Sequence, residues 1–172
     1  QNKNPGSNSG TTPLHAAAYT GHLGICQFIL DRVDDKNPSD NFGWTPLHDA
    51  AYGREDVFKA IFNEIQDKNP GDTRGWTPLH EAVSRRNLEI CRFIIDRVNE
   101  KNPSNNYGRT PLHWAAFSGQ EEVFKAIFNE IEDKNPGNII GTTPMHEAAC
   151  VGISGICQFI LDRVDDKNPS DN

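Results

Sequence analysis

The chain has 172 residues, of which 35% are hydrophobic and 24% charged, and its formal net charge is -7. Phosphate backbones and anionic membrane surfaces attract clustered Lys and Arg, so this acidic balance argues against nucleic acid and membrane as partners. The length fits one domain, residues 1–172, and no apolar run approaches the ~20 residues that span a bilayer. The four cysteines (Cys26, Cys91, Cys150 and Cys157) form no C-x-x-C pair, which favours a reducing, cytoplasmic setting.

Two short motifs recur at a fixed interval along the chain. Lys-Asn-Pro occurs six times, and Thr-Pro-(Leu or Met)-His occurs five times. The threonines of the second motif are Thr12, Thr45, Thr77, Thr110 and Thr143, at steps of 33, 32, 33 and 33 residues. A period of this size indicates an array of stacked structural repeats. The five units cover approximately residues 10–42, 43–74, 75–107, 108–140 and 141–172.

The first predicted element of each unit is a short helix that begins after the motif threonine. Threonine is a good N-cap, and proline at the first helical position lacks only an N–H that would be unpaired there. In the first unit, Leu14, Ala17 and Ala18 then form a narrow apolar face. We expect a glycine to end the helix in the left-handed conformation. These glycines are Gly21, Gly53, Gly119 and Gly152, and Arg86 stands at this position in the third unit.

The second predicted element is a helix whose sequence is of the type ICQFILDRV or VFKAIFNEI. We expect Asn-Pro to stop it, because a residue that precedes proline avoids helical angles. A polar loop with a glycine (Gly43, Gly75, Gly108 or Gly141) leads to the next Thr-Pro. The second unit is one residue short between Tyr52 and Val57, which predicts a tighter turn between its two helices. One helix pair cannot bury its apolar face alone, whereas stacked pairs can.

A 33-residue unit with T-P-L-H-x-A, then a glycine, then a second apolar helix resembles the ankyrin repeat. The resemblance covers nearly all of residues 10–172 and occurs five times. It implies an all-α fold, an ankyrin-repeat solenoid of five stacked helix-turn-helix units joined by β-hairpin-like loops. Members of the family are binding modules without catalytic activity, so the chain is not expected to be an enzyme. The usual glycine after the second helix is replaced by Val33, Ile65, Val98, Ile131 and Val164, which predicts a different helix end.

The five motif histidines (His15, His48, His80, His113 and His146) are interpreted as structural. Three positions after the N-cap, a histidine can hydrogen-bond the capping threonine and the neighbouring loop. Stacked helices lie ~8–10 Å apart and zinc–nitrogen bonds measure ~2 Å, so equivalent histidines cannot share an ion. We therefore expect no metal, no cofactor and no catalytic residue. The predicted structural residues are Thr45, Pro46, His48, Thr77, Pro78, His80, Thr110, Pro111 and His113.

Comparison of the five copies separates constant positions, which serve the stack, from variable positions, which face something else. All three tryptophans and all three tyrosines occupy variable positions in the first helix and the loop. Aromatic residues and arginines are enriched in protein-binding hot spots, and in ankyrin repeats these positions line the concave face. The predicted partner-binding residues are Phe42, Trp44, Asp49, Tyr52, Arg74, Trp76, Glu81, Arg85, Tyr107, Arg109, Trp114 and Phe117. The alternative for Trp44 and Trp76 is that they merely cover neighbouring loops.

The second helices alternate between two types, which we call A (units one, three and five) and B (units two and four). One position carries Cys26, Phe58, Cys91, Phe124 and Cys157, and the position two residues on carries Phe28, Ala60, Phe93, Ala126 and Phe159. Each unit is bulky where its neighbour is not, which predicts a constant volume at every junction. A third position carries Arg32, Glu64, Arg97, Glu130 and Arg163, which predicts a ladder of opposite charges between neighbouring helices.

These patterns predict a non-catalytic scaffold that binds a protein of unknown identity on the concave face formed by loop tips and first helices. Two alternatives stay open. The first is an engineered or recently duplicated array without a native partner, which the identity of residues 25–41 and 156–172 favours. The second is a passive structural segment of a longer array. Stacking of copies end to end is a further expectation.

Overall fold

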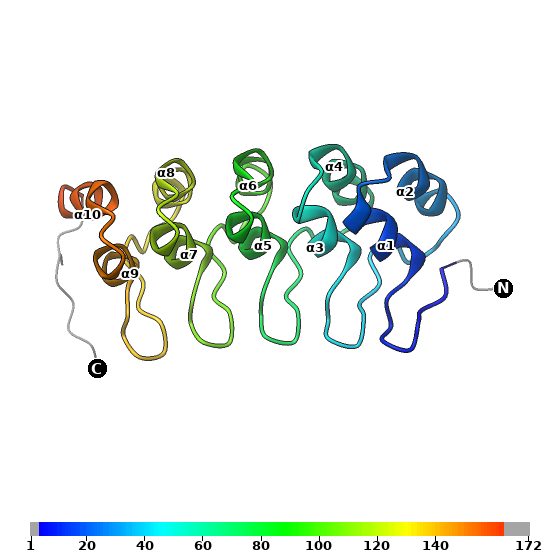
Figure 1. Cartoon of the computed structure of the whole chain (residues 1–172), viewed down its shortest axis with the longest axis horizontal. Coiled ribbons are helices and arrows are strands. Elements are labelled where there is room, and N and C mark those ends of the chain that lie inside the picture. Colours follow the sequence, from blue (N-terminus) through cyan, green and yellow to red (C-terminus); the bar gives the residue numbers. More distant parts are fainter. Residues whose placement is uncertain (1–3, 164–172) are drawn as a thin grey trace.

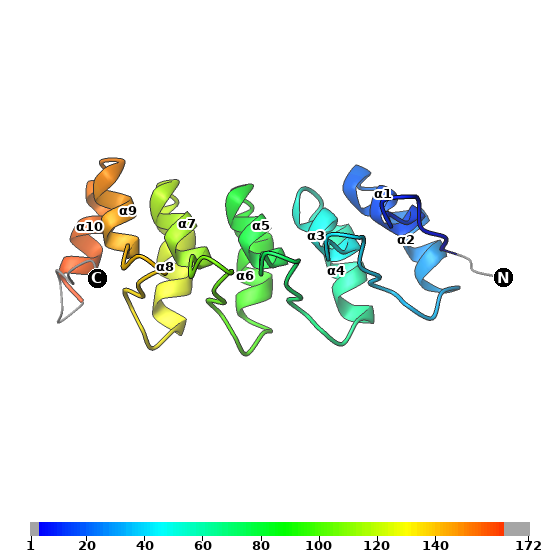
Figure 2. The same ribbon diagram turned by 90° about the horizontal axis from the view of Figure 1, so that it is seen from below.

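The computed structural model describes residues 4–163, which form ten helices and no strand. The helices are α1 (Pro13–Thr20), α2 (Leu23–Leu30), α3 (Pro46–Ala51), α4 (Glu55–Glu64), α5 (Pro78–Ser84), α6 (Leu88–Ile95), α7 (Pro111–Phe117), α8 (Glu121–Glu130), α9 (Pro144–Cys150) and α10 (Ser154–Leu161). The first helices of the units form one row, the second helices form another, and hairpin-shaped loops project on the side of the first helices (Figure 1). Seen from below, the helix pairs follow one another in a single line (Figure 2). The predicted all-α solenoid is confirmed.

All five first helices begin at the motif proline, and the preceding threonine is extended and forms a capping box with the histidine. Gly21 ends α1 with a φ of 76°. Arg86 takes the same left-handed conformation after α5, with a φ of 60°, although a side chain is disfavoured there. Its guanidinium donates a hydrogen bond to the Ser118 carbonyl at 2.7 Å, which anchors the residue to the next unit.

The missing residue of the second unit changes α3 and not the length of the turn. Three residues separate α3 from α4, as three separate α7 from α8, but α3 has six residues and α7 has seven. The prediction of a tighter turn was therefore wrong. The prediction that Gly53 is left-handed was also wrong. Gly119 after α7 is left-handed, with a φ of 68°, whereas the φ of Gly53 lies outside the left-handed region. The shorter helix reaches α4 through Tyr52 in a right-handed helical conformation.

The recurrent Lys-Asn-Pro motif caps two helices at once. The Asn37 side-chain oxygen accepts the Leu47 N–H at 3.1 Å, so it satisfies an unpaired donor in the first turn of α3. The equivalent asparagines do the same for α1, α5, α7 and α9. In the other direction, Lys68 and Lys101 donate to the carbonyls of Phe62 and Ile95 in the last turns of α4 and α6.

The second helices end earlier than the Asn-Pro signal predicts, and the two types end differently. The A-type helices have eight residues and are followed by a right-handed turn, as at Asp31 after α2. The B-type helices have ten residues and end at Ile65 or Ile131, both extended. The glycine-free ends are thus closed differently in the two types, a difference that the prediction did not include. Val164 lies outside the described residues.

Large side chains meet large ones at the junctions from a B unit to an A unit. The Phe93 ring of α6 lies edge-on against Phe62 at 5.1 Å and Phe58 at 6.1 Å, both from α4. The same cluster forms between α8 and α10. At A-to-B junctions the equivalent positions hold small residues such as Cys26 and Ala60, and α2 and α4 approach more closely than α4 and α6. The prediction of constant volume at every junction was therefore wrong, because each side chain faces only one neighbour.

The predicted charge ladder is also absent from the described residues. Arg32, Arg97 and Arg163 each lie over the phenylalanine of their own helix, with the guanidinium carbon 3.8–4.0 Å from the ring centroid. Glu64 pairs with Lys36 at 2.5 Å, and Glu130 lies 3.9 Å from Lys101. The lysine of the preceding Lys-Asn-Pro motif therefore takes the place that was assigned to the arginine.

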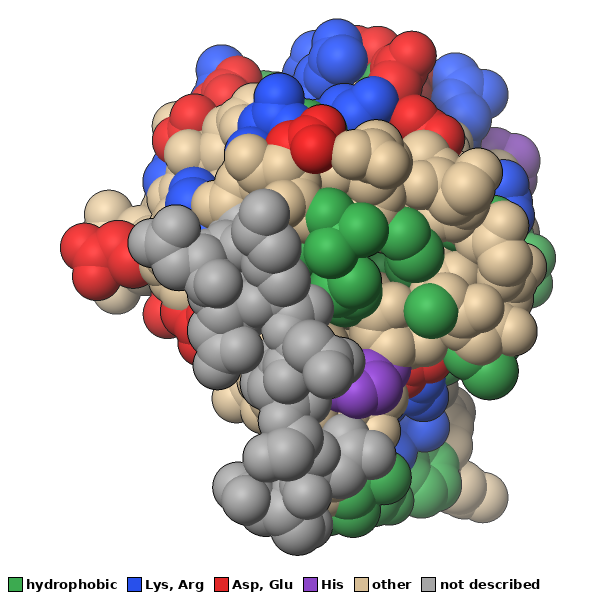
Figure 3. All heavy atoms as spheres, turned by 90° about the vertical axis from the view of Figure 1, so that its left-hand side faces the viewer, with side chains coloured by type: hydrophobic (Ala, Val, Ile, Leu, Met, Phe, Trp, Pro, Cys, Tyr) green, Lys and Arg blue, Asp and Glu red, His purple; other side chains and the backbone are tan. Residues whose placement is uncertain are grey.

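Among residues 4–163, the apolar core runs from unit to unit, and apolar side chains are exposed at both ends of the described array. Within the described residues, the alanine and leucine faces of α3, α5 and α7 are fully buried between neighbours. At the C-terminal end, hydrophobic side chains gather on the surface of the last unit (Figure 3). Ala149 is exposed there, whereas the equivalent Ala51 and Ala116 are fully buried.

Candidate functional site

The tryptophans of the second and third units are fixed by the same pair of contacts. Each precedes a capping threonine, and its indole N–H donates to the carboxylate that follows the motif histidine. The distances are 2.9 Å from Trp44 to Asp49 and 3.1 Å from Trp76 to Glu81. Each indole also packs on the motif histidine of its own unit, with ring centroids 4.6 and 4.9 Å apart. The tryptophans are therefore rigid, half-buried parts of the face formed by first helices and loops.

The motif histidines bridge neighbouring units. In the second unit, His48 Nδ1 accepts the Thr45 backbone N–H at 3.1 Å, so its Nε2 carries the proton and donates to the Trp76 carbonyl at 2.9 Å. His80 makes the equivalent bridge to the Arg109 carbonyl at 3.1 Å. Burial lowers the pKa of both histidines to about 4, because the charged form would lose its hydration, although the acceptor carbonyls oppose this shift. Neutral His48 and His80 thus connect successive loops.

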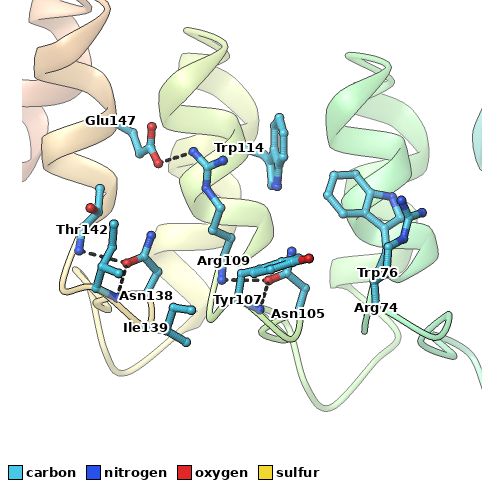
Figure 4. Close-up of a pocket in the computed structure, with 11 residues that line it drawn as sticks. Arg74, Trp76, Asn105, Tyr107, Arg109, Trp114, Asn138, Ile139, Thr142 and Glu147 are labelled. Carbon is cyan, nitrogen blue, oxygen red and sulfur yellow. Dashed lines mark hydrogen bonds and ion pairs between the residues drawn. The ribbon is translucent and has the colours of Figure 1, made fainter.

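A hollow of about 560 Å³ opens on this face over units three to five (Figure 4). Its lining residues are Arg74, Trp76, Asn105, Tyr107, Arg109, Trp114, Asn138, Ile139, Ile140, Thr142 and Glu147. We call this site the hollow. Five predicted partner-binding residues meet in it: Arg74, Trp76, Tyr107, Arg109 and Trp114. They come from two successive loops, before α5 and before α7, and from α7 itself.

The wall of the hollow is a chain of aromatic and ionic contacts. Trp76 and Trp114 meet edge to face, with ring centroids 5.2 Å apart. The Arg109 guanidinium lies over Trp114 at 4.9 Å and pairs with Glu147 of α9. Glu147 is buried, so this ion pair satisfies a carboxylate that would otherwise be costly to bury.

Side-chain amides fix the turns of the loops that line the hollow. The Asn105 side-chain oxygen accepts the backbone N–H groups of Tyr107 and Arg109 at 2.9 and 3.0 Å. Asn138 does the same for Ile140 and Thr142. One backbone hydrogen bond, from Ile139 N–H to the Tyr107 carbonyl at 3.1 Å, joins the two loops. These contacts place the tips of both loops on the rim of the hollow.

Other predicted residues extend from the hollow toward the N-terminus. Arg85 pairs with Glu81 at 2.8 Å and lies over the Tyr52 ring at 3.9 Å. Tyr52 in turn contacts Tyr19, with ring centroids 5.0 Å apart. Phe42 and Trp44 line a smaller hollow of about 340 Å³ that shares Arg74 with the first. Asp49 accepts the indole hydrogen bond of Trp44. Burial raises the pKa of Asp49 to about 7, although this hydrogen bond opposes the shift.

The predicted set includes one residue at the margin of the hollow and leaves out three exposed apolar residues. Phe117 lies 6.1 Å from Trp114 and is exposed outside the lining. Ile139 and Ile140, which were left out, are 69% and 63% exposed on the loop tip. Two adjacent large apolar residues at a loop tip occur only in this unit, and this signal would have found them. Tyr19 was left out as well.

In residues 4–163, no group of three His, Cys, Asp or Glu side chains is arranged to hold a metal ion. Over the same part of the chain, no helix has the length and apolar character required to cross a membrane.

Stacked helix pairs with bridging histidines and projecting loops define a class of helical repeat proteins. The sequence model described as Ankyrin repeats (3 copies) matches residues 1–72 and 61–138. The chain belongs to the ankyrin repeat family. Members of this family are generally protein–protein interaction modules and are typically non-catalytic. Among curated proteins, none matches the chain.

Proposed function

We propose that the chain is a non-catalytic scaffold that binds a protein partner in the hollow over units three to five. The observation that carries the proposal is the convergence, on one apolar depression, of variable residues from the loops before α5, α7 and α9 and from α7 and α9. Hot spots of protein interfaces are enriched in tryptophan, tyrosine and arginine, and these three types line the hollow.

The lining residues divide into a rigid wall and an exposed rim. Trp76 is held by its hydrogen bond to Glu81 and by its packing on His80, so it loses little freedom when a partner binds. Tyr107 on the rim is 58% exposed, and the apolar side chains of Ile139 and Ile140 beside it are also accessible. We therefore assign direct contact mainly to the rim and a supporting role to the tryptophans. Trp76→Ala would also leave the buried Glu81 without its indole donor, so it is a poor test of binding.

The partner that fits is a protein segment with a large apolar side chain. The apolar lining supplies Tyr107, Ile139 and Ile140 for this anchor, and Arg74 at the edge has a side chain that is 63% exposed. Arg74 already pairs with Asp72 at 2.8 Å, so it offers its remaining donors to an acceptor on the partner.

The experiment is a selection of binders from a displayed peptide library against the full chain, followed by affinity measurements on variants. Tyr107→Ala and Ile139→Ala should each weaken the selected binders by at least about tenfold. Phe28→Ala is the matched control, because Phe28 is as exposed as Tyr107 but lies on the first unit. Binders that tolerate both rim substitutions and lose affinity with the control would place the interaction outside the hollow.

A further inference from the structure

The first unit exposes apolar side chains on the side of α1 and α2 that faces away from α3 and α4. We call this side the N-terminal face. Ile25 is 52% exposed and Phe28, three residues on in the same helix, is 59% exposed, and Pro13 at the start of α1 is exposed as well. Large apolar side chains that lie together on a surface mark a site of interaction.

Equivalent side chains are covered in the other two A units. Ile90 of α6 and Ile156 of α10 are fully buried, whereas Ile25 is half exposed. Phe93 and Phe159 are partly buried, and their exposure is lower than that of Phe28. The sequence does not cause this difference, because residues 25–30 and 156–161 have the same six letters.

The cover is supplied by the preceding B unit. Phe159 packs edge-on against Phe128 at 5.1 Å and Phe124 at 6.2 Å, and Lys125 lies 5.5 Å from its ring centroid. The guanidinium that lies over the ring is not the cause, because Arg32 covers Phe28 at 3.8 Å as Arg163 covers Phe159 at 4.0 Å. Phe28 differs from Phe159 by the absence of a phenylalanine pair among the described residues.

We propose that the N-terminal face is a docking surface for a B-type repeat, joined in line through the loop of residues 4–12. Such a repeat carries the helix V-F-K-A-I-F of residues 57–62 and 123–128. Its two phenylalanines, four residues apart, would enclose Phe28 as Phe58 and Phe62 enclose Phe93. This surface is separate from the hollow, and the inference goes beyond the protein binding proposed there.

The loop of residues 4–12 supports an in-line arrangement. The Asn4 side-chain oxygen accepts the Leu14 N–H at 3.2 Å. Asn69 makes the same contact with Leu79 at 3.1 Å, in the loop that leads from a B unit into an A unit. A second copy of this chain is a poorer occupant, because its last unit is of type A. It would offer Cys157 in place of a phenylalanine.

Two extended chains test the proposal. In one, a copy of residues 41–67 replaces Gln1 and Asn2 and leads into Lys3, which adds a B unit. In the matched control, a copy of residues 73–100 at the same place adds an A unit. Phe28→Ala is then made in the original chain and in both extended chains, and each thermal midpoint is measured.

The midpoint should fall by less than about 1 °C in the original chain and by about 5 °C in the B-extended chain. In the A-extended chain the fall should be at most half of this. Equal falls in the two extended chains would overturn the specificity for a B unit. A fall in the B-extended chain no larger than in the original chain would show that the added unit does not dock.

A double-mutant cycle between Phe28 and the added copy of Phe62 sharpens the test, with the Phe62–Phe93 pair as reference. Non-additive midpoint shifts like those of the reference pair are expected, and additive shifts would contradict the contact. Sedimentation of the original chain gives one more outcome. An end-to-end dimer that Phe28→Ala abolishes would make a second copy the occupant, and the proposal would be wrong.

Discussion

The sequence Ile-Cys-Gln-Phe-Ile-Leu occurs in α2 at residues 25–30 and in α10 at residues 156–161, and the two copies are buried on opposite sides. In α2, Cys26 and Leu30 are buried and Ile25 is exposed. In α10, Ile156 is fully buried, while Cys157 is only partly buried. The first copy is covered by the unit that follows it, and the second copy by the unit that precedes it. The contribution of a side chain to the free energy of unfolding therefore depends on the junction that it faces.

The largest expected effect is the difference in stability loss between alanine substitutions at Ile156 and at Ile25. Ile156→Ala should lower the free energy of unfolding by about 3 kcal/mol, because it leaves a cavity in a filled junction. Ile25→Ala should cost about 1 kcal/mol or less, because half of the side chain already contacts water. Denaturant unfolding measures both, and Ile90→Ala is the matched interior control. Similar costs for Ile25 and Ile156 would break the comparison.

The histidines extend the comparison from the ends to the middle of the array. His80→Ala should cost about 1–3 kcal/mol, because it empties a fully buried site and removes one of the two hydrogen bonds to the Arg109 carbonyl, which keeps the Asn105 N–H. His146→Ala in the last unit should cost less, because His146 is only partly buried. Thermal unfolding of both variants measures the difference. A larger loss for His146→Ala would contradict the bridging role of the interior histidines.

The pH dependence of stability should come largely from the same interior histidines. The pKa of His48 and His80 is lowered by burial to about 4 in the folded state, against about 6.5 in the unfolded chain. Their contribution is fully present above pH 6.5 and is lost as the pH falls toward 4, because the unfolded state then binds more protons. The thermal midpoint should fall over this window. A His80→Gln variant should show a flatter fall, and an unchanged slope would show that other groups cause it.

Asp49 should have a smaller effect of opposite sign. Burial raises its pKa to about 7 in the folded state, so the folded chain favours the protonated form between about pH 4 and 7, and stability is lost as the pH rises through 7. Asp49→Asn keeps an acceptor for the Trp44 indole and removes the charge. It should stabilise the chain by about 1–2 kcal/mol at pH 8, because solvent screening limits the effect, and by less at pH 5. A gain that does not grow with pH would contradict the shift.

The helix pairs, their period and the role of the histidines could be predicted because local chemistry determines them. A threonine, a proline and a histidine within four residues define a capped helix start wherever they recur. The direction of each side chain could not be predicted in this way. Comparison of the copies shows that large and small residues alternate at two positions, but not that Phe93 faces the preceding unit. The predicted volume balance and charge ladder therefore both failed.

The candidate site was predicted in outline for a similar reason. Variation between the copies identified Trp76, Tyr107 and Trp114, since these positions have no constant role in the stack. It did not show that Trp76 lies on its own histidine and donates to Glu81, a contact across five residues that needs the geometry of the helix start. The alternative that the tryptophans cover neighbouring structure therefore describes part of their role.

The reactivity of the two cysteines in the duplicated helices tests most directly whether the junction determines burial. The native chain is treated with an alkylating reagent at pH 8, and Cys26 and Cys157 are followed in their separate peptides by mass spectrometry. Burial raises the pKa of Cys26 to about 11, so little of the reactive thiolate forms there. Cys157 should react at least about tenfold faster than Cys26, and the two rates should become equal in denaturant. Equal rates in the native chain would contradict the account, because identical letters would then have identical environments at both ends.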